Sequence, residues 1–204
     1  MNYKRILSIA LVGSALLVGQ STFAQDGKMK KDKMTKTEKP MQEKTVMVGG
    51  AEMYPSKNII ENAVNSKAHT TLVAAVKAAG LVETLSGTGP FTVFAPTNAA
   101  FEKLPEGTVE TLLMTENKPM LAGILTYHVI AGKVNAADVL ALIEQNDGRA
   151  SVATVAGGML TFFTEDGDVY VEDENGNTAM VTIADVNQSN GVIHVIDSVL
   201  LPKK

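Results

Sequence analysis

The sequence predicts an α+β domain in which helices pack on an antiparallel sheet. Apolar residues recur at helical spacing in the first half of this domain, and after Gly148 they change to the two-residue period of strands. Gly, Asp or Asn stand between most of those strands. Helices followed by a meander of strands favour this class over a βαβ nucleotide-binding fold. Because the unit is not repeated, we expect one domain from residue 49 to 204.

Helix-ending and helix-starting residues divide the first half of this domain. Gly80 is expected to end the second of two helices, and Pro96 to end a strand because it removes a backbone donor. Thr97 or Asn98, Thr108, Pro119 and Asn135 are suited to helix starts. The expected helices lie at 58–79, 81–85, from 97, from 108, from 119 and from 135, and the expected strands at 91–94, 127–130, 152–155, 159–163, 169–171, 179–183 and 192–196.

The N-terminus has the pattern of a secretory signal. Lys4 and Arg5 precede an apolar run, and Thr22-Phe23-Ala24 forms a small-x-small end, so residues 1–24 are predicted to be cut after Ala24. The apolar run is shorter than the about 20 residues that a membrane span needs, so no stable span is expected. We therefore expect a secreted protein, either periplasmic or at the cell surface.

Residues 25–48 form a segment rich in Met and Lys without aromatic residues, and we predict a disordered linker. Two other interpretations stay open: a basic arm attracted to anionic envelope polymers, and thioethers that gather a soft ion such as Cu(I). The chain has no cysteine, so its core alone must stabilise it. Its formal charge is -4 and falls further once Lys4 and Arg5 are removed, which argues against nucleic acid as a partner.

Three segments carry a resemblance to a known family. They read T-V-F-A-P-T-N-A-A-F at 92–101, L-T-Y-H-V-I at 125–130 and N-G-V-I-H-V-I-D-S-V-L-L-P at 190–202. Asn190-Gly191 in the last of these is expected to form a turn with positive φ. In this order the segments resemble the first signature, the tyrosine-histidine motif and the second signature of the fasciclin-like domain, a secreted or surface module. The resemblance covers essentially residues 49–202.

The resemblance implies a wedge-shaped antiparallel β-sandwich flanked by several helices. It also implies adhesion or matrix interaction without catalysis, and it makes Tyr127 and His128, with Leu125, Val129 and Ile130, the candidate partner-binding residues. The alternative is packing, because an apolar-flanked pair on a strand alternates faces and places at least one ring in the core.

Other candidate sites have weaker patterns. His69, His128 and His194 lack the paired spacing of zinc ligands, and His194 is expected on a polar or rim face of its strand. The acidic stretch from Glu165 to Asn177 departs from the EF-hand pattern and is interpreted as two hairpin turns, Asp-Gly and Asn-Gly. We therefore predict no metal and no cofactor.

The leading hypothesis is a non-enzymatic, exported adhesion or envelope-interaction protein, with roles such as biofilm formation. No G-x-S-x-G elbow, cysteine nucleophile or P-loop is present. Its partner is expected to be a cell-surface or matrix protein or an envelope polymer, and the protein itself a monomer. The first alternative is a periplasmic protein that binds a small apolar ligand in a pocket lined by Met159, Phe162 and Phe163. The second is a metal-buffering Met-rich tail on an inert scaffold.

Overall fold

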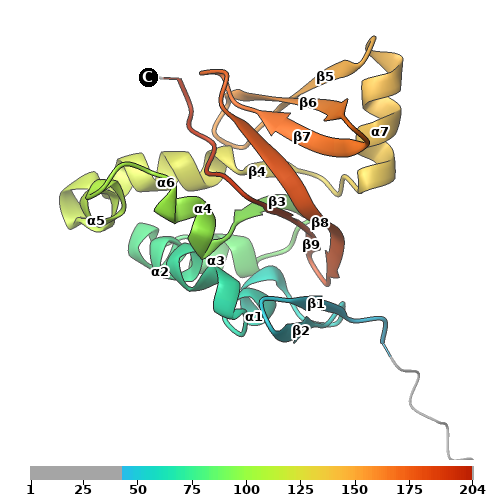
Figure 1. Cartoon of the computed structure of the whole chain (residues 1–204). Helices are drawn as coiled ribbons and strands as arrows, with labels where there is room; N and C mark the ends of the chain where they lie inside the picture. The colour runs from blue at the N-terminus through green and yellow to red at the C-terminus, as the bar shows by residue number, and fades with distance from the viewer. Residues whose placement is uncertain (1–42, 204) are drawn as a thin grey trace, which may run out of the picture. The chain divides into compact units, whose positions relative to one another are not determined.

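The computed structural model describes residues 43–203. The predicted signal at 1–24 and most of the predicted linker lie outside these residues. Helices and strands alternate in the first part and strands dominate the last part (Figure 1). In chain order they are β1 Val46–Val48, β2 Ala51–Met53, α1 Ile59–Ala63, η1 Lys67–His69, α2 Thr70–Ala79, α3 Val82–Ser86, β3 Phe91–Pro96, α4 Asn98–Glu102, α5 Thr108–Leu113, η2 Thr115–Asn117, α6 Lys118–Tyr127, β4 Val129–Ala131, α7 Ala136–Gln145, β5 Arg149–Ala153, β6 Met159–Glu165, β7 Asp168–Glu172, β8 Thr178–Gln188 and β9 Gly191–Ile196.

Seven strands form one sheet in the order β4-β3-β9-β8-β7-β6-β5, and β1 pairs with β2 in a separate ribbon. β8 joins the two halves of the sheet, because its first residues pair with β7 and the rest pair with β9. Its register shifts between Val181 and Val186, where Asp185 has a φ of 56°. Such irregularities bend a strand and increase its twist. The bend in β8 therefore changes the direction of the sheet between its β4-β3-β9 half and its β7-β6-β5 half, as the expected wedge requires.

The α+β prediction is confirmed, but one pair of strands differs from an antiparallel arrangement. β3 and β9 run parallel, with Phe91 opposite Gly191 and Pro96 opposite Ile196. A β-carbon on Gly191 would lie 2.0 Å from the carbonyl oxygen of Phe91. Gly191 is thus required for the close approach of β9 to β3, and it is not among the residues with positive φ. The expected turn is present between β8 and β9 at residues 189–190, but neither Asn190 nor Gly191 has the positive φ that was predicted.

Local capping explains several helix boundaries. Thr97 accepts a hydrogen bond from the Ala100 N–H at the start of α4, and Asn135 with Asp138 forms a capping box on α7. Pro119 lies in the first turn of α6, where its missing N–H costs little. Gly80 ends α2 in the left-handed conformation, with a φ of 75°. These predicted boundaries are confirmed.

Several predicted boundaries differ from the structure: β5 begins three residues earlier than expected, β8 continues to Gln188, and the two clearest differences are at β1 and Tyr127. β1 lies inside the range given to the linker, because Val46–Val48 pairs with Ala51–Met53 and buries Val48 and Met53. Tyr127 was expected at the start of a strand, but it is the last residue of α6, and β4 begins at Val129. An apolar run of four residues fits either a helix end or a strand, so periodicity alone does not separate them.

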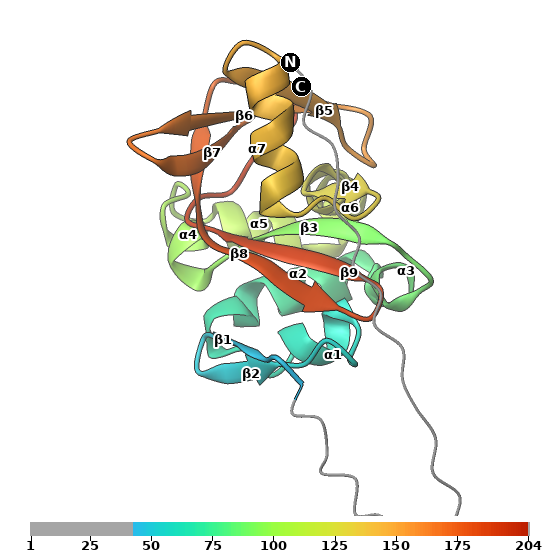
Figure 2. The same cartoon turned by 90° about the vertical axis from the view of Figure 1, so that its right-hand side faces the viewer.

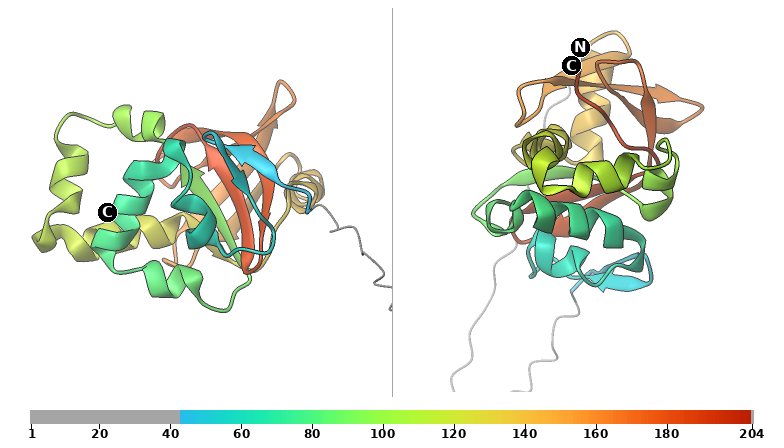
Figure 3. Two further views of the ribbon diagram at one scale, coloured as in Figure 1. Left: turned by 90° about the horizontal axis from the view of Figure 1, so that it is seen from below. Right: turned by 90° about the vertical axis from the view of Figure 1, so that its left-hand side faces the viewer.

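The buried residues fall into two clusters. The helix-side core lies between the helices α1 to α6 and the strands β3, β8 and β9 (Figures 1 and 2). The sheet-side core lies where α7 packs on β5 and β6, and it centres on Phe94, Leu160 and Phe162 (Figure 2). β3 separates them, since Val93 and Ala95 belong to the first core and Phe94 to the second. The view from below shows α1, α2 and α3 covering one side of these strands (Figure 3).

Candidate functional site

Tyr127 is the last residue of α6, and His128 lies between α6 and β4. The Tyr127 side chain is fully buried, and its hydroxyl donates to the Met159 carbonyl at 2.7 Å. The same oxygen accepts a hydrogen bond from the Glu174 N–H at 3.1 Å. Tyr127 thereby links the end of α6 to the start of β6 and to the turn between β7 and β8.

His128 is buried against the segment that follows β9. Its Nδ1 lies 2.8 Å from the Ile124 carbonyl, and its Nε2 lies 3.0 Å from the Leu200 N–H. Nδ1 must therefore donate and Nε2 accept, which is the arrangement of a neutral ring. Burial lowers the pKa of His128 to about 4, although the Ile124 carbonyl and the Asp173 carboxylate oppose this shift.

The residues after β9 are held by further hydrogen bonds. The Asp173 carboxylate accepts from the Leu201 N–H at 2.9 Å, and the Asn175 side chain donates to the Leu201 carbonyl at 2.7 Å. Asp173 also accepts from the N–H groups of Asn175 and Asn177. The chain after β9 is therefore fastened by His128 on one side and by the β7–β8 turn on the other.

All five candidate partner-binding residues are buried. Tyr127 and Ile130 belong to the sheet-side core, whereas Leu125 and Val129 belong to the helix-side core. His128 is 3% exposed. This placement supports the packing alternative for the tyrosine-histidine pair. Partner binding through these residues stays a prediction, and it would require the domain to open.

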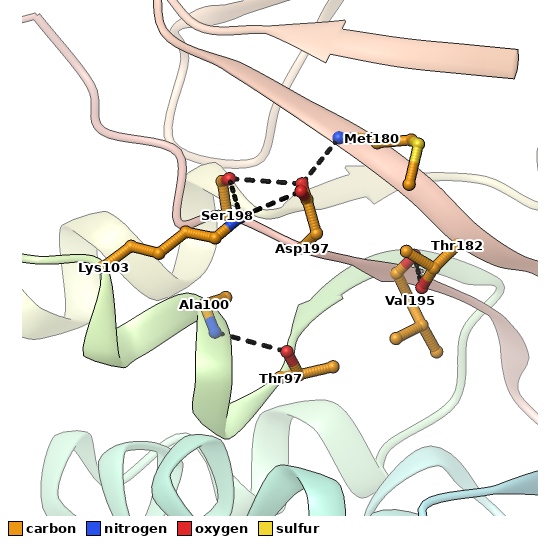
Figure 4. A network of polar contacts seen from close by, with 8 residues as sticks. All are labelled: Thr97, Ala100, Lys103, Met180, Thr182, Val195, Asp197 and Ser198. Carbon is orange, nitrogen blue, oxygen red and sulfur yellow. Dashed lines mark hydrogen bonds and ion pairs between the residues drawn. The ribbon is translucent and has the colours of Figure 1, made fainter.

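A second polar cluster joins the end of α4 and β8 to the second signature segment (Figure 4). Lys103 forms an ion pair with Asp197 at 2.9 Å and also donates to the Ser198 hydroxyl. The other Asp197 oxygen accepts from the Met180 N–H at 2.8 Å. Burial opposes ionisation of Asp197, but the hydrogen bonds from Lys103 and Met180 outweigh it and keep its pKa below the ordinary value. The cluster fastens α4 and β8 to the end of β9.

The histidines and the acidic turns were the other candidates for a site. Within residues 43–203, no three His, Asp or Glu side chains are grouped so as to hold a metal ion. His194 is not on a polar face as expected: it is 2% exposed, its ring stacks on Phe94, and Nε2 contacts the Val134 carbonyl at 2.9 Å. It points inward because Phe94 and His194 are register partners in the β3–β9 pair.

The acidic stretch forms turns, as expected. Asp166 and Gly167 both have positive φ between β6 and β7, and Gly176 does so between β7 and β8. The buried Asp173 carboxylate takes its hydrogen bonds from the backbone and the side chain of its own turn and from Leu201. Its oxygens act as acceptors for the turn rather than facing solvent.

The expected pocket of Met159, Phe162 and Phe163 is absent from the described residues. Phe162 points into the sheet-side core beside a cavity of about 20 Å³, whereas Met159 is exposed and Phe163 stacks on Tyr170. Residues 159 and 163 share one face of β6 and residue 162 lies on the other, because strand side chains alternate. The pocket that would have favoured the small-molecule alternative is therefore not formed by these three residues. An apolar cavity of about 40 Å³ lies instead in the helix-side core, against α1, α2 and α3.

Sequence reasoning missed a groove beside α4. It has a volume of about 370 Å³ and runs between α4, α5 and the first turn of α2. Half-buried Phe101, Leu104 and Val109 line it, and the side chains of Glu102, Glu106 and Glu110 are exposed along it. The signal that could have found it is the gathering of three glutamates at 102, 106 and 110, around the non-helical connection between α4 and α5.

No helix among the described residues is long and apolar enough to cross a membrane. The family model described as Fasciclin domain matches residues 67–202. Protein sll1483 from Synechocystis sp. is 53% identical over 160 residues, which are 78% of this chain and 82% of that protein. The cell surface glycolipoprotein MPB83 from Mycobacterium bovis is 41% identical over 122 residues, which are 60% of this chain and 48% of that protein.

Among solved structures, the FAS1 domain pair from the insect cell adhesion molecule fasciclin I is similar, with a TM-score of 0.64 and 22% identity. The match covers 72% of this chain and 52% of that one, so the chain spans about half the length of that structure. At this identity the likeness concerns the fold.

Proposed function

The chain belongs to the fasciclin domain family, and on this premise we propose that it is a non-enzymatic protein that acts by noncovalent contact at the cell envelope or in the matrix. The likeness to a cell surface glycolipoprotein supports a place outside the cytoplasm. Tyr127 and His128 are buried, so we look for the contact surface among exposed residues.

The groove beside α4 is the observation that carries the proposal, and we assign the contact to it. Its floor is apolar and only half-buried, which leaves area that a partner could cover. Glu102, Glu106 and Glu110 give it three exposed carboxylates, whereas Lys103 turns away to pair with Asp197. A negative rim around an apolar floor suits a basic, partly apolar segment of a surface or matrix protein, because complementary charge steers the encounter and fixes its register.

A charge-reversal experiment tests the groove. The mature protein, its Glu106→Lys/Glu110→Lys variant and a Glu144→Lys/Glu165→Lys control are used to capture partners from cell-envelope and matrix fractions. Both pairs of glutamates are exposed, and both variants change the net charge equally. We expect the groove variant to lose about ten-fold in binding at low salt and the control to lose little.

Two results would count against the proposal, and they are distinguishable. Equal loss in both variants would mean that net charge, not the groove, governs binding. A wild-type protein that captures nothing above background, together with unchanged attachment and biofilm formation in a deletion strain, would contradict the adhesion role itself.

Export is a further part of the proposal. Cleavage after Ala24 would leave Gln25 as the first residue of the mature protein. N-terminal sequencing of protein recovered from periplasmic and extracellular fractions tests this directly. Deletion of residues 25–42 in the capture experiment separates the Met/Lys-rich segment from the domain, because β1 and the rest of the fold stay intact.

A further inference from the structure

The helix-side core contains an apolar cavity that no part of the proposed function uses. It has a volume of about 40 Å³ and lies between the helices α1, α2 and α3 and the strands β3, β8 and β9. Its inner wall includes Leu72, Val76 and Ile193, all buried. Of the other lining residues, Ile60 and Val73 are half-buried and Lys77 is exposed. The cavity shares no residue with the groove beside α4.

One polar side chain, His69, lines the inside of this cavity. It ends η1 just before α2 and is 3% exposed. Its Nδ1 lies 2.9 Å from the Ser66 hydroxyl oxygen, and that hydroxyl donates to the Val48 carbonyl at 3.2 Å. Because the Ser66 proton is engaged, its oxygen accepts from Nδ1–H. This assigns the ring proton to Nδ1 and leaves Nε2 as an acceptor.

His69 Nε2 is the one buried side-chain nitrogen or oxygen in residues 43–203 that has no hydrogen-bond partner. Burial lowers the pKa of His69, and the nearby Ala95 carbonyl offsets this only in part, without the geometry of a hydrogen bond. The other two histidines provide a contrast. Both ring nitrogens of His128 and of His194 have partners at 2.8 to 3.3 Å. Buried polar groups are nearly always satisfied, so the exception at His69 calls for an occupant of the cavity.

We propose that this cavity binds a small neutral alcohol, whose hydroxyl donates to His69 Nε2 and whose aliphatic part packs against the apolar wall. The ligand must be neutral because no buried charged group faces the cavity to stabilise an ion. It must carry a donor because the assigned tautomer of His69 offers only a lone pair. It must be small, since the volume is well below the ~150 Å³ of an apolar cavity that holds benzene.

The test compares two small isomers, ethanol and dimethyl ether, which have the same atoms but differ in the presence of a donor. Each is titrated into the full mature protein while the histidine ring nitrogens and the methyl groups are followed by NMR. We expect ethanol to bind about five-fold more tightly than the ether, the effect of one hydrogen bond between neutral groups. Its binding should shift His69 Nε2 and the methyls of Val76 and Ile193, while the ring nitrogens of His128 and His194 stay unchanged.

Two variants separate the hydrogen bond from the cavity. His69→Leu should abolish the preference for the alcohol, leaving the two isomers within about two-fold of each other. Ala63→Leu fills the cavity from α1 without changing His69, and it should weaken the binding of both isomers about ten-fold or more. Ala122→Leu is the matched control, a half-buried alanine packed against the same core but outside the cavity, and it should bind like the wild type.

Three outcomes would overturn the proposal. The first is equal binding of both isomers to the wild type. The second is a free protein whose His69 carries its proton on Nε2. The third is no saturable binding of either isomer, as expected if a single water molecule is the only occupant. If His69→Leu fails to fold, the isomer comparison and the pair Ala63→Leu and Ala122→Leu still decide the matter.

Discussion

The helix-side core and the sheet-side core are both apolar and buried, but the helix-side core is packed less closely. The sheet-side core surrounds a cavity of about 20 Å³, its aromatic rings stack, and His194 at its edge uses both ring nitrogens. The helix-side core contains twice that volume and an unpartnered nitrogen on His69. Close packing and satisfied polar groups indicate a region selected for stability. We infer that the helix-side core retains a space for binding.

Matched truncations of one leucine in each core should show the largest difference. Leu160→Ala in the sheet-side core is expected to cost about 4 kcal/mol, because Leu160 is completely buried and loses contacts on all sides. Leu72→Ala at the cavity wall is expected to cost about 2 to 3 kcal/mol, since one side of Leu72 already faces open space. Urea denaturation of both variants measures this. Equal losses would contradict the difference in packing.

Acid should weaken the junction between the cores through His128. Its folded-state pKa of about 4 lies below the ordinary value of 6.5, so the unfolded chain binds more protons between these two pH values. Stability is therefore full above pH 6.5 and falls as the pH is lowered toward 4, by about 3 kcal/mol from this group. The lowered pKa values of His69 and His194 act in the same direction.

A His128→Gln variant checks the assignment. It should be less stable than the wild type at pH 7, because Leu200 and Ile124 lose their ring partner, but its stability should depend less on pH between 6.5 and 4. Thermal unfolding across this pH range provides the comparison. An unchanged slope would assign the acid sensitivity to other groups.

Replacement by leucine should change the free energy of unfolding by unequal amounts at the two remaining histidines, His194 and His69. His194→Leu leaves the Val134 carbonyl and the Asp185 N–H without their ring partners and is expected to cost about 2 kcal/mol. His69→Leu removes an unsatisfied nitrogen, and the Ser66 hydroxyl keeps its hydrogen bond to the Val48 carbonyl. We therefore expect the free energy of unfolding to change by no more than about 1 kcal/mol. Chemical denaturation at pH 7.5, where all three rings are neutral, is the measurement. A larger loss at His69 would contradict our view of its ring.

The smallest effect on stability is expected at the polar cluster of Lys103, Asp197 and Ser198. Lys103 and Asp197 are 54% and 36% exposed at their side chains, so Lys103→Ala should cost about 0.5 kcal/mol and less in high salt. Asp197→Ala should cost more, because the Met180 N–H then loses its acceptor as well. Denaturation at two salt concentrations separates them. Equal losses would mean that the ion pair, and not the backbone contact, matters most, because both variants break that pair.

Much of this fold could be predicted from the sequence because its signals are local. Thr97, Pro119, Asn135 and Gly80 fix helix ends through capping and backbone geometry that act within one turn. The Asp166-Gly167 turn is equally local. The parallel β3–β9 pair was missed because it joins residues about a hundred positions apart, and nothing within either strand specifies the direction of its partner.

The sites were harder to predict than the fold. Tyr127 and His128 attract attention as polar aromatic residues, but their burial depends on α6, on the β7–β8 turn and on Leu200 meeting in space. The environment of His69 likewise comes from Ser66, Val48 and Ala95, which approach only once β1 and β3 have packed on α2. A histidine next to a helix start has no local signal that distinguishes a satisfied ring from an unsatisfied one.

Xenon binding is the most direct test of the claim that the two cores differ, because xenon enters apolar cavities in proportion to their free volume and forms no hydrogen bonds. Methyl spectra of the protein under xenon pressure should show shifts at Leu72, Val76 and Ile193 around the larger cavity and little change at Val139 and Val181 around the smaller one. Equal shifts in both regions, or none in the helix-side core, would contradict the account.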